Sequence, residues 1–176
     1  MTDPHTLHSI HPPDRRPNAL DLARWAEDRL FESTGPGAAP ARLYGLEVLD
    51  GGLLAAVSRQ HRASVGSATT AARLVFLGEA ADAGALVLGP VGVAACQFDA
   101  AVLASSRWEP AVSPLPRPGE HLVRRRARVV VVVAGAGVAT ATRFEHDPDH
   151  VLLARGLAWG GAASVQLAAM WNGARE

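Results

Sequence analysis

The chain has 176 residues, a length typical of one domain, and its 17 basic side chains balance 17 acidic ones. This balance argues against a dedicated nucleic-acid-binding protein, in which a basic excess is expected. Every basic residue is arginine, so Schiff-base chemistry and the lysine of a P-loop are excluded. The single cysteine, Cys96, excludes an internal disulfide and is typical of a reducing cytoplasm, where we expect the protein to act.

The first 17 residues differ in composition from the rest of the chain. They contain four prolines and three histidines and lack the apolar core of a signal peptide. We therefore expect a flexible N-terminal tail over 1–17 and a single α/β domain over 18–176. A histidine-rich tail without fixed geometry does not define a metal site, and we assign neither a metal nor a cofactor.

The segments up to residue 120 are predicted to alternate between helices and strands. Asn18 is a favourable N-cap with Asp21 in the following turn, and apolar residues recur after it at helical spacing. The run at 53–60 fits a short helix and a returning strand equally well. The expected order is a helix over 19–32, a strand over 42–49, a turn at 50–52, a helix over 68–83, a strand over 85–95 with a bend at Gly89-Pro90, a helical stretch from Asp99, and a proline-rich loop over 109–120.

Five consecutive valines, Val129 to Val133, form the most distinctive element of the sequence. A short β-branched run that ends near a glycine is typical of a strand buried on both faces. We expect this strand to be the centre of the core in a layered helix-sheet-helix α/β fold. An acidic turn at 146–150 follows it, and the glycines at 156–161 predict a tight turn before a final strand or helix.

Taken in this order, the chain from Ala19 to its end resembles the N-terminal half of a thiolase-fold condensing enzyme, in the ketoacyl synthase III branch. The matching pieces are Phe98-Asp99, the arginine-preceded valine strand at 128–132, the Asp147-Pro148 turn and the glycine-alanine segment at 160–165. The resemblance implies a thiolase-like half domain that acts on or alongside acyl-thioesters. Its partners would be acyl-CoA or an acyl carrier protein.

Two departures from that family bear on catalysis. The family carries a nucleophilic cysteine at a helix N-terminus, where backbone dipoles favour the thiolate. The matching position here is Ala104, and Cys96 reaches the family's cysteine position only in a shifted register that loses the Phe98-Asp99 match. The family's second half, which supplies a catalytic histidine and asparagine, has no counterpart in this sequence. We therefore expect an incomplete catalyst, either a homo-oligomer or the partner of a chain that supplies the second half.

Three residues are candidates for chemistry. Cys96 lies between an apolar run and a predicted helix start, where a nucleophile could be activated; the alternative is a buried structural cysteine. Ser105 could act as a nucleophile with His61 as its base. The alternative for Ser105 is a small polar residue tolerated in an alanine-rich helix, and the alternative for His61 is a solvated loop histidine.

Two charged clusters could bind ligands. Arg124, Arg125 and Arg126 could hold the phosphates of an acyl carrier, or they could simply keep the entry to the valine strand soluble. His146 and His150 could face a metal, but Pro148 between them favours a turn.

A noncatalytic ligand-binding or protein-interaction module is the alternative function, favoured by the lack of lysine and of an acid/base pair. Residues 151–171 are nearly as long as a membrane span, but their glycines and Arg155 favour a buried segment, so we expect no membrane partner. Whether the chain is catalytic stays open at this stage.

Overall fold

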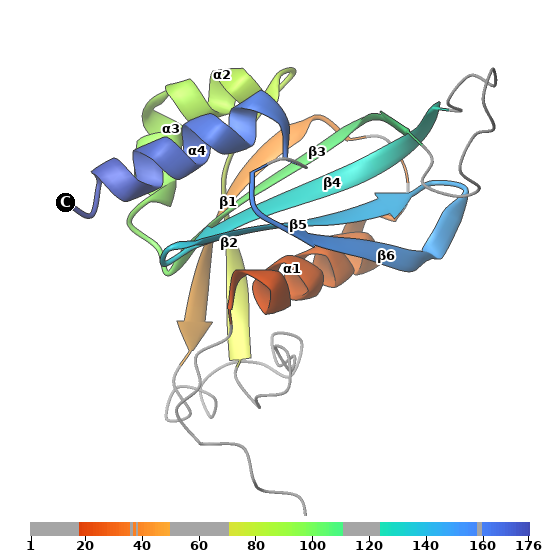
Figure 1. Cartoon of the computed structure of the whole chain (residues 1–176), viewed down its shortest axis with the longest axis horizontal. Helices are drawn as coiled ribbons and strands as arrows, with labels where there is room; N and C mark the ends of the chain where they lie inside the picture. Colours follow the sequence, from red (N-terminus) through yellow and green to blue (C-terminus); the bar gives the residue numbers. More distant parts are fainter. Residues whose placement is uncertain (1–17, 36, 38, 50–70, 111–123, 158–159) are drawn as a thin grey trace, which may run out of the picture.

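The structure, a computed structural model, describes residues 18–35, 37, 39–49, 71–110, 124–157 and 160–176. Six strands form one sheet, and helices cover it on both sides (Figure 1). The elements in chain order are α1 (Ala19–Thr34), β1 (Ala41–Leu49), β2 (Ala71–Ala80), α2 (Ala83–Leu88), α3 (Pro90–Ala95), β3 (Ala100–Pro110), β4 (Arg124–Ala134), β5 (Gly137–Phe144), β6 (Asp147–Arg155) and α4 (Gly161–Gly173).

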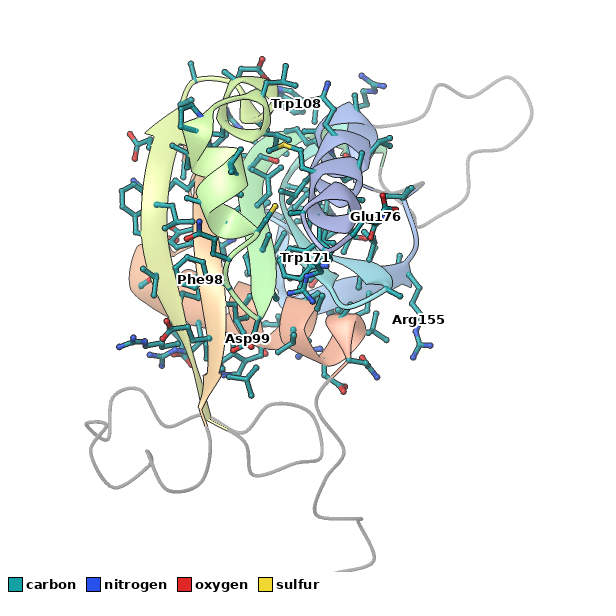
Figure 2. All side chains as sticks on the ribbon, turned by 90° about the vertical axis from the view of Figure 1, so that its left-hand side faces the viewer. Phe98, Asp99, Trp108, Arg155, Trp171 and Glu176 are labelled. Carbon is teal, nitrogen blue, oxygen red and sulfur yellow. The ribbon has the colours of Figure 1, made fainter. Side chains whose placement is uncertain are left out.

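The sheet is antiparallel throughout, with the order β2-β1-β3-β4-β5-β6. Helix α1 packs on one face, called here the α1 face, and α2, α3 and α4 pack on the opposite face as the helix layer (Figures 1 and 2). The predicted mixed α/β class with helices on both sides of a sheet is therefore confirmed. The β4–β5 and β5–β6 pairs are hairpins with two-residue turns, the β1–β2 and β3–β4 pairs join strands that are consecutive in the chain, and the pairing of β1 with β3 encloses β2, α2 and α3.

The valine strand was predicted correctly. It lies within β4, between β3 and β5, and none of Val129 to Val133 is more than 2% exposed. Because side chains alternate along a strand, Val130 and Val132 join the core under α1, and the other three valines join the core under the helix layer. Burying each of these side chains contributes roughly 1.5–3 kcal/mol, so this strand ties the two cores together.

Helix α1 was also predicted correctly and runs to Thr34, two residues beyond the predicted end. Its start is a capping box: the Asp21 N–H donates to Asn18 Oδ1 at 3.0 Å, and the Asn18 N–H donates to the Asp21 carboxylate at 3.3 Å. Gly35 ends the helix with a positive φ of 69°, and its N–H donates to Phe31 O. The strand predicted at 42–49 is confirmed as β1.

Three predicted elements were wrong. Residues 71–80 form strand β2 rather than part of a helix, residues 83–95 form α2 and α3 rather than a strand, and the stretch after Asp99 is strand β3 rather than a helix. Runs of Ala, Leu and Val carry no decisive period, and pairing with distant strands overrides their local preference. The chain does change direction at Gly89-Pro90, but between two helices rather than within a strand, and Pro90 begins α3 as a first-turn proline.

The turns around β6 also differ in part from prediction. The bend lies at Glu145-His146, and Asp147 already begins β6, so the expected turn at 146–150 is mostly strand. The glycines before the last element do precede a helix, α4, with positive φ at Gly156 and Gly161. The predicted tail, the turn at 50–52, the run at 53–60 and positions 111–120 of the proline-rich loop lie outside the described residues.

Candidate functional site

The helix layer has an unusual composition. None of the residues in α2, α3 and α4 is Asp, Glu, Arg, Lys or His. A surface helix normally carries charged residues on the side away from the core, whereas a helix that is apolar all round is normally buried. The helix layer is therefore built as an interior element.

The inner side of the layer is packed against the sheet. Four side chains on this inner side are each at most 5% exposed and belong to the same core as the odd-numbered valines of β4: Leu86, Val87, Leu167 and Trp171. The indole N–H of Trp171 donates to Gly135 O at 2.9 Å, which fixes α4 over the turn after β4. The layer is thus held rigidly in place from below.

The outer side of the layer is exposed and still apolar. Leu88 in α2 is 72% exposed, Val93 in α3 is 57% exposed and Val165 in α4 is 48% exposed. The same three helices also carry small apolar residues that are exposed: Ala85, Pro90, Ala162 and Ala169. We call this outer side the charge-free face. Because α2 and α3 both contact α4, these exposed apolar side chains lie on neighbouring helices, and exposed apolar side chains grouped in this way are typical of surfaces that contact another molecule.

The Phe98-Asp99 pair, which carried part of the family resemblance, has a structural role at the end of this layer. The Asp99 carboxylate accepts a hydrogen bond from Val48 N at 2.8 Å, and Asp99 N donates to Leu46 O at 3.0 Å. The Phe98 ring lies against Gly45, so close that a Cβ there would be 2.3 Å from ring atoms. The pair therefore clips the chain after α3 onto β1 (Figure 2).

A cavity of about 280 Å³ lies at the other end of the layer, and Ser105 lines it. Asp82 before α2 and Gly160 before α4 border this cavity, together with Arg107 from β3. Arg107 is ion-paired with Glu109 and donates to Gly160 O at 3.0 Å. No histidine is among the residues that line the cavity, so its described walls offer Ser105 no imidazole base.

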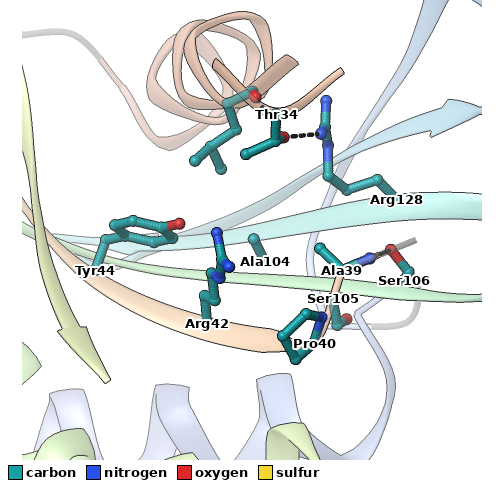
Figure 3. A pocket seen from close by; sticks show the side chains of 10 residues that line it. Thr34, Ala39, Pro40, Arg42, Tyr44, Ala104, Ser105, Ser106 and Arg128 are labelled. Atoms are coloured by element: carbon teal, nitrogen blue, oxygen red, sulfur yellow. Dashed lines mark hydrogen bonds between the residues drawn. The ribbon is translucent and has the colours of Figure 1, made fainter. Parts of the chain in front are cut away.

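Ser106 points to the opposite side of β3. Its hydroxyl accepts a hydrogen bond from Ala39 N at 3.2 Å, beside a cavity of only about 20 Å³ under α1. Figure 3 shows this site, with Ser105 pointing away from α1 and Arg128 bonded to Thr34. The cavity has room for about one water molecule, so it is too small for a substrate.

Cys96 lies at the C-terminal end of α3, and the expected helix start beside it is absent. Its side chain is buried and its thiol donates to Gly92 O at 3.4 Å. Burial raises the pKa of the thiol, and the positive charge of Arg175 opposes this shift only in part. This environment disfavours the thiolate, which is the reactive species, and fits a structural cysteine.

The remaining candidates do not come together. His61 lies outside the described residues, and Ala104, at the position of the family's nucleophile, is buried in the middle of β3. Arg124, Arg125 and Arg126 are exposed at the start of β4, where alternate residues point to opposite faces of the sheet. The three arginines therefore do not form a single clamp for a phosphate.

Both described histidines have partners: the ring of His146 packs edge-on against Phe144, and His150 is hydrogen-bonded to Asp147. The His150 Nδ1 lies 2.7 Å from Asp147 Oδ1, and this hydrogen bond raises the pKa of the imidazole above its ordinary range. The side chains of His150 and Asp147 are exposed on β6. Within the described ranges, no three His, Cys, Asp or Glu residues gather closely enough to hold a metal ion.

Sequence reasoning missed a buried ionic network on the α1 face. Glu27 is fully buried and binds Arg128 through both carboxylate oxygens, at 2.6 and 2.9 Å, and Arg143 at 2.8 Å. Arg143 also binds Asp28 at 2.7 Å, and both guanidinium groups lie over the ring of Phe31. A signal was present: Glu27 falls on the apolar side of α1, where an acid requires a buried cation.

No helix in the described part of the chain combines the length and apolar character that a bilayer crossing requires. No family model matches the sequence, and comparison with curated proteins and with solved structures finds no match.

Proposed function

We propose that this protein is a noncatalytic interaction module that binds another polypeptide through the charge-free face. One observation carries the proposal: Leu88, Val93 and Val165 are exposed on helices that contain no charged residue. Interfaces between proteins have an apolar centre that is depleted in charge and a polar rim. The charge-free face has the composition of such a centre.

The chemistry of the rest of the molecule supports this function. Cys96 is buried with a raised thiol pKa, and Ser105 lines a cavity whose described walls contain no histidine. Nucleophilic catalysis requires a nucleophile within hydrogen-bond reach of a base. The described residues instead place their best-defined charged groups in the network around Glu27, where they stabilise the fold.

Photo-crosslinking tests the proposal. A photoreactive amino acid replaces Val93, which is 57% exposed on the charge-free face, or Phe76, which is 55% exposed on β2 and serves as the control. After irradiation in the producing cells, we expect a covalent adduct with a polypeptide from position 93 only. Adding Leu88→Glu should abolish that adduct. Equal adducts from both positions, or none from position 93, would contradict the proposal.

A role in acyl-thioester metabolism, together with a thiolase-like layering of the fold, remains a prediction from the resemblance. Its direct test is the intact mass of the protein after incubation with a short acyl-CoA, with and without Cys96→Ala. A thioester adduct that depends on Cys96 would establish an acyl-accepting thiol and would overturn the noncatalytic assignment.

A further inference from the structure

We draw no further inference here: the strongest candidate, the charge-free face on the outer side of α2, α3 and α4, belongs to the site already described, and nothing in the described part of the chain shows which polypeptide covers it.

Discussion

The two sides of the sheet use opposite chemistry for the same task of covering apolar strands. The outer side of α1 is charged and paired, with Arg24 bound to Asp28 and Arg29 bound to Glu32, and its inner side buries Glu27 between two arginines. The helix layer has no charge on either side. Because α1 has the surface of a solvated helix and the helix layer does not, the comparison supports the proposal that, among the described helices, the helix layer is the part that binds a partner.

The buried network on the α1 face should give the largest effect on stability. Glu27→Ala leaves Arg128 and Arg143 buried without their shared carboxylate and should lower the free energy of unfolding by about 3–5 kcal/mol. Urea unfolding followed by circular dichroism measures this loss. Glu32→Ala is the control: it removes an acid from the same helix whose side chain is 63% exposed, and it should cost less than about 1 kcal/mol. Similar losses of stability in both variants would show that Glu27 does not form buried ion pairs with Arg128 and Arg143.

Helix α2 offers a comparison within one element. Leu86→Ala opens a cavity under the helix layer and should lower the free energy of unfolding by about 2–5 kcal/mol, whereas Leu88→Ala should lower it by about 0.5 kcal/mol or less. Urea unfolding of the purified chain, followed by circular dichroism, checks both values. Leu88→Ala should weaken binding through the charge-free face, and Leu86→Ala should not act on that binding directly. A large loss of stability from Leu88→Ala would mean that this side chain packs against the rest of its own chain.

The clip at the end of the helix layer should show an intermediate effect. A Cβ at Gly45 would lie 2.3 Å from the Phe98 ring, so Gly45→Ala should force the ring off β1 and cost about 1–3 kcal/mol. Thermal unfolding measures the loss, and Gly37→Ala, where a Cβ meets open space, is the control. The double variant Gly45→Ala/Phe98→Ala should lose less than the sum of its single changes, because the clash is removed. If the losses of the two single variants simply add in the double variant, the loss caused by Gly45→Ala does not arise from a clash with Phe98.

Sequence reasoning succeeded where the pattern is local and failed where a partner is distant. The capping box at Asn18 and the valine run of β4 carry their own signals, and both elements were predicted correctly. β2 forms a strand because it pairs with β1, and ion pairs such as Arg42 with Glu79, 37 positions apart in the sequence, support that pairing. The spacing of apolar residues within 71–80 contains no information about this distant partner. The lack of charge in α4 is visible in the sequence, but its exposure is not, because it depends on which side packs against the sheet.

The buried thiol of Cys96 gives the smallest expected effect and contrasts the two sides of the sheet once more. The α1 face buries charged side chains because it supplies partners for them, whereas burial under the helix layer raises the pKa of the thiol and favours its neutral form.

In the unfolded chain the thiol ionises at its ordinary pKa of about 8.5. As the pH rises through that value, the unfolded state loses a proton that the folded state keeps, so stability falls until the pH reaches the folded pKa; below the ordinary pKa the thiol has no effect. We therefore expect the free energy of unfolding to decrease more between about pH 8 and pH 10 in the unmodified protein than in Cys96→Ala. The difference between the two proteins isolates the thiol from every other group that titrates in this range. Equal slopes would show that Cys96 ionises as freely in the folded chain as in water, which would reopen its role as a nucleophile.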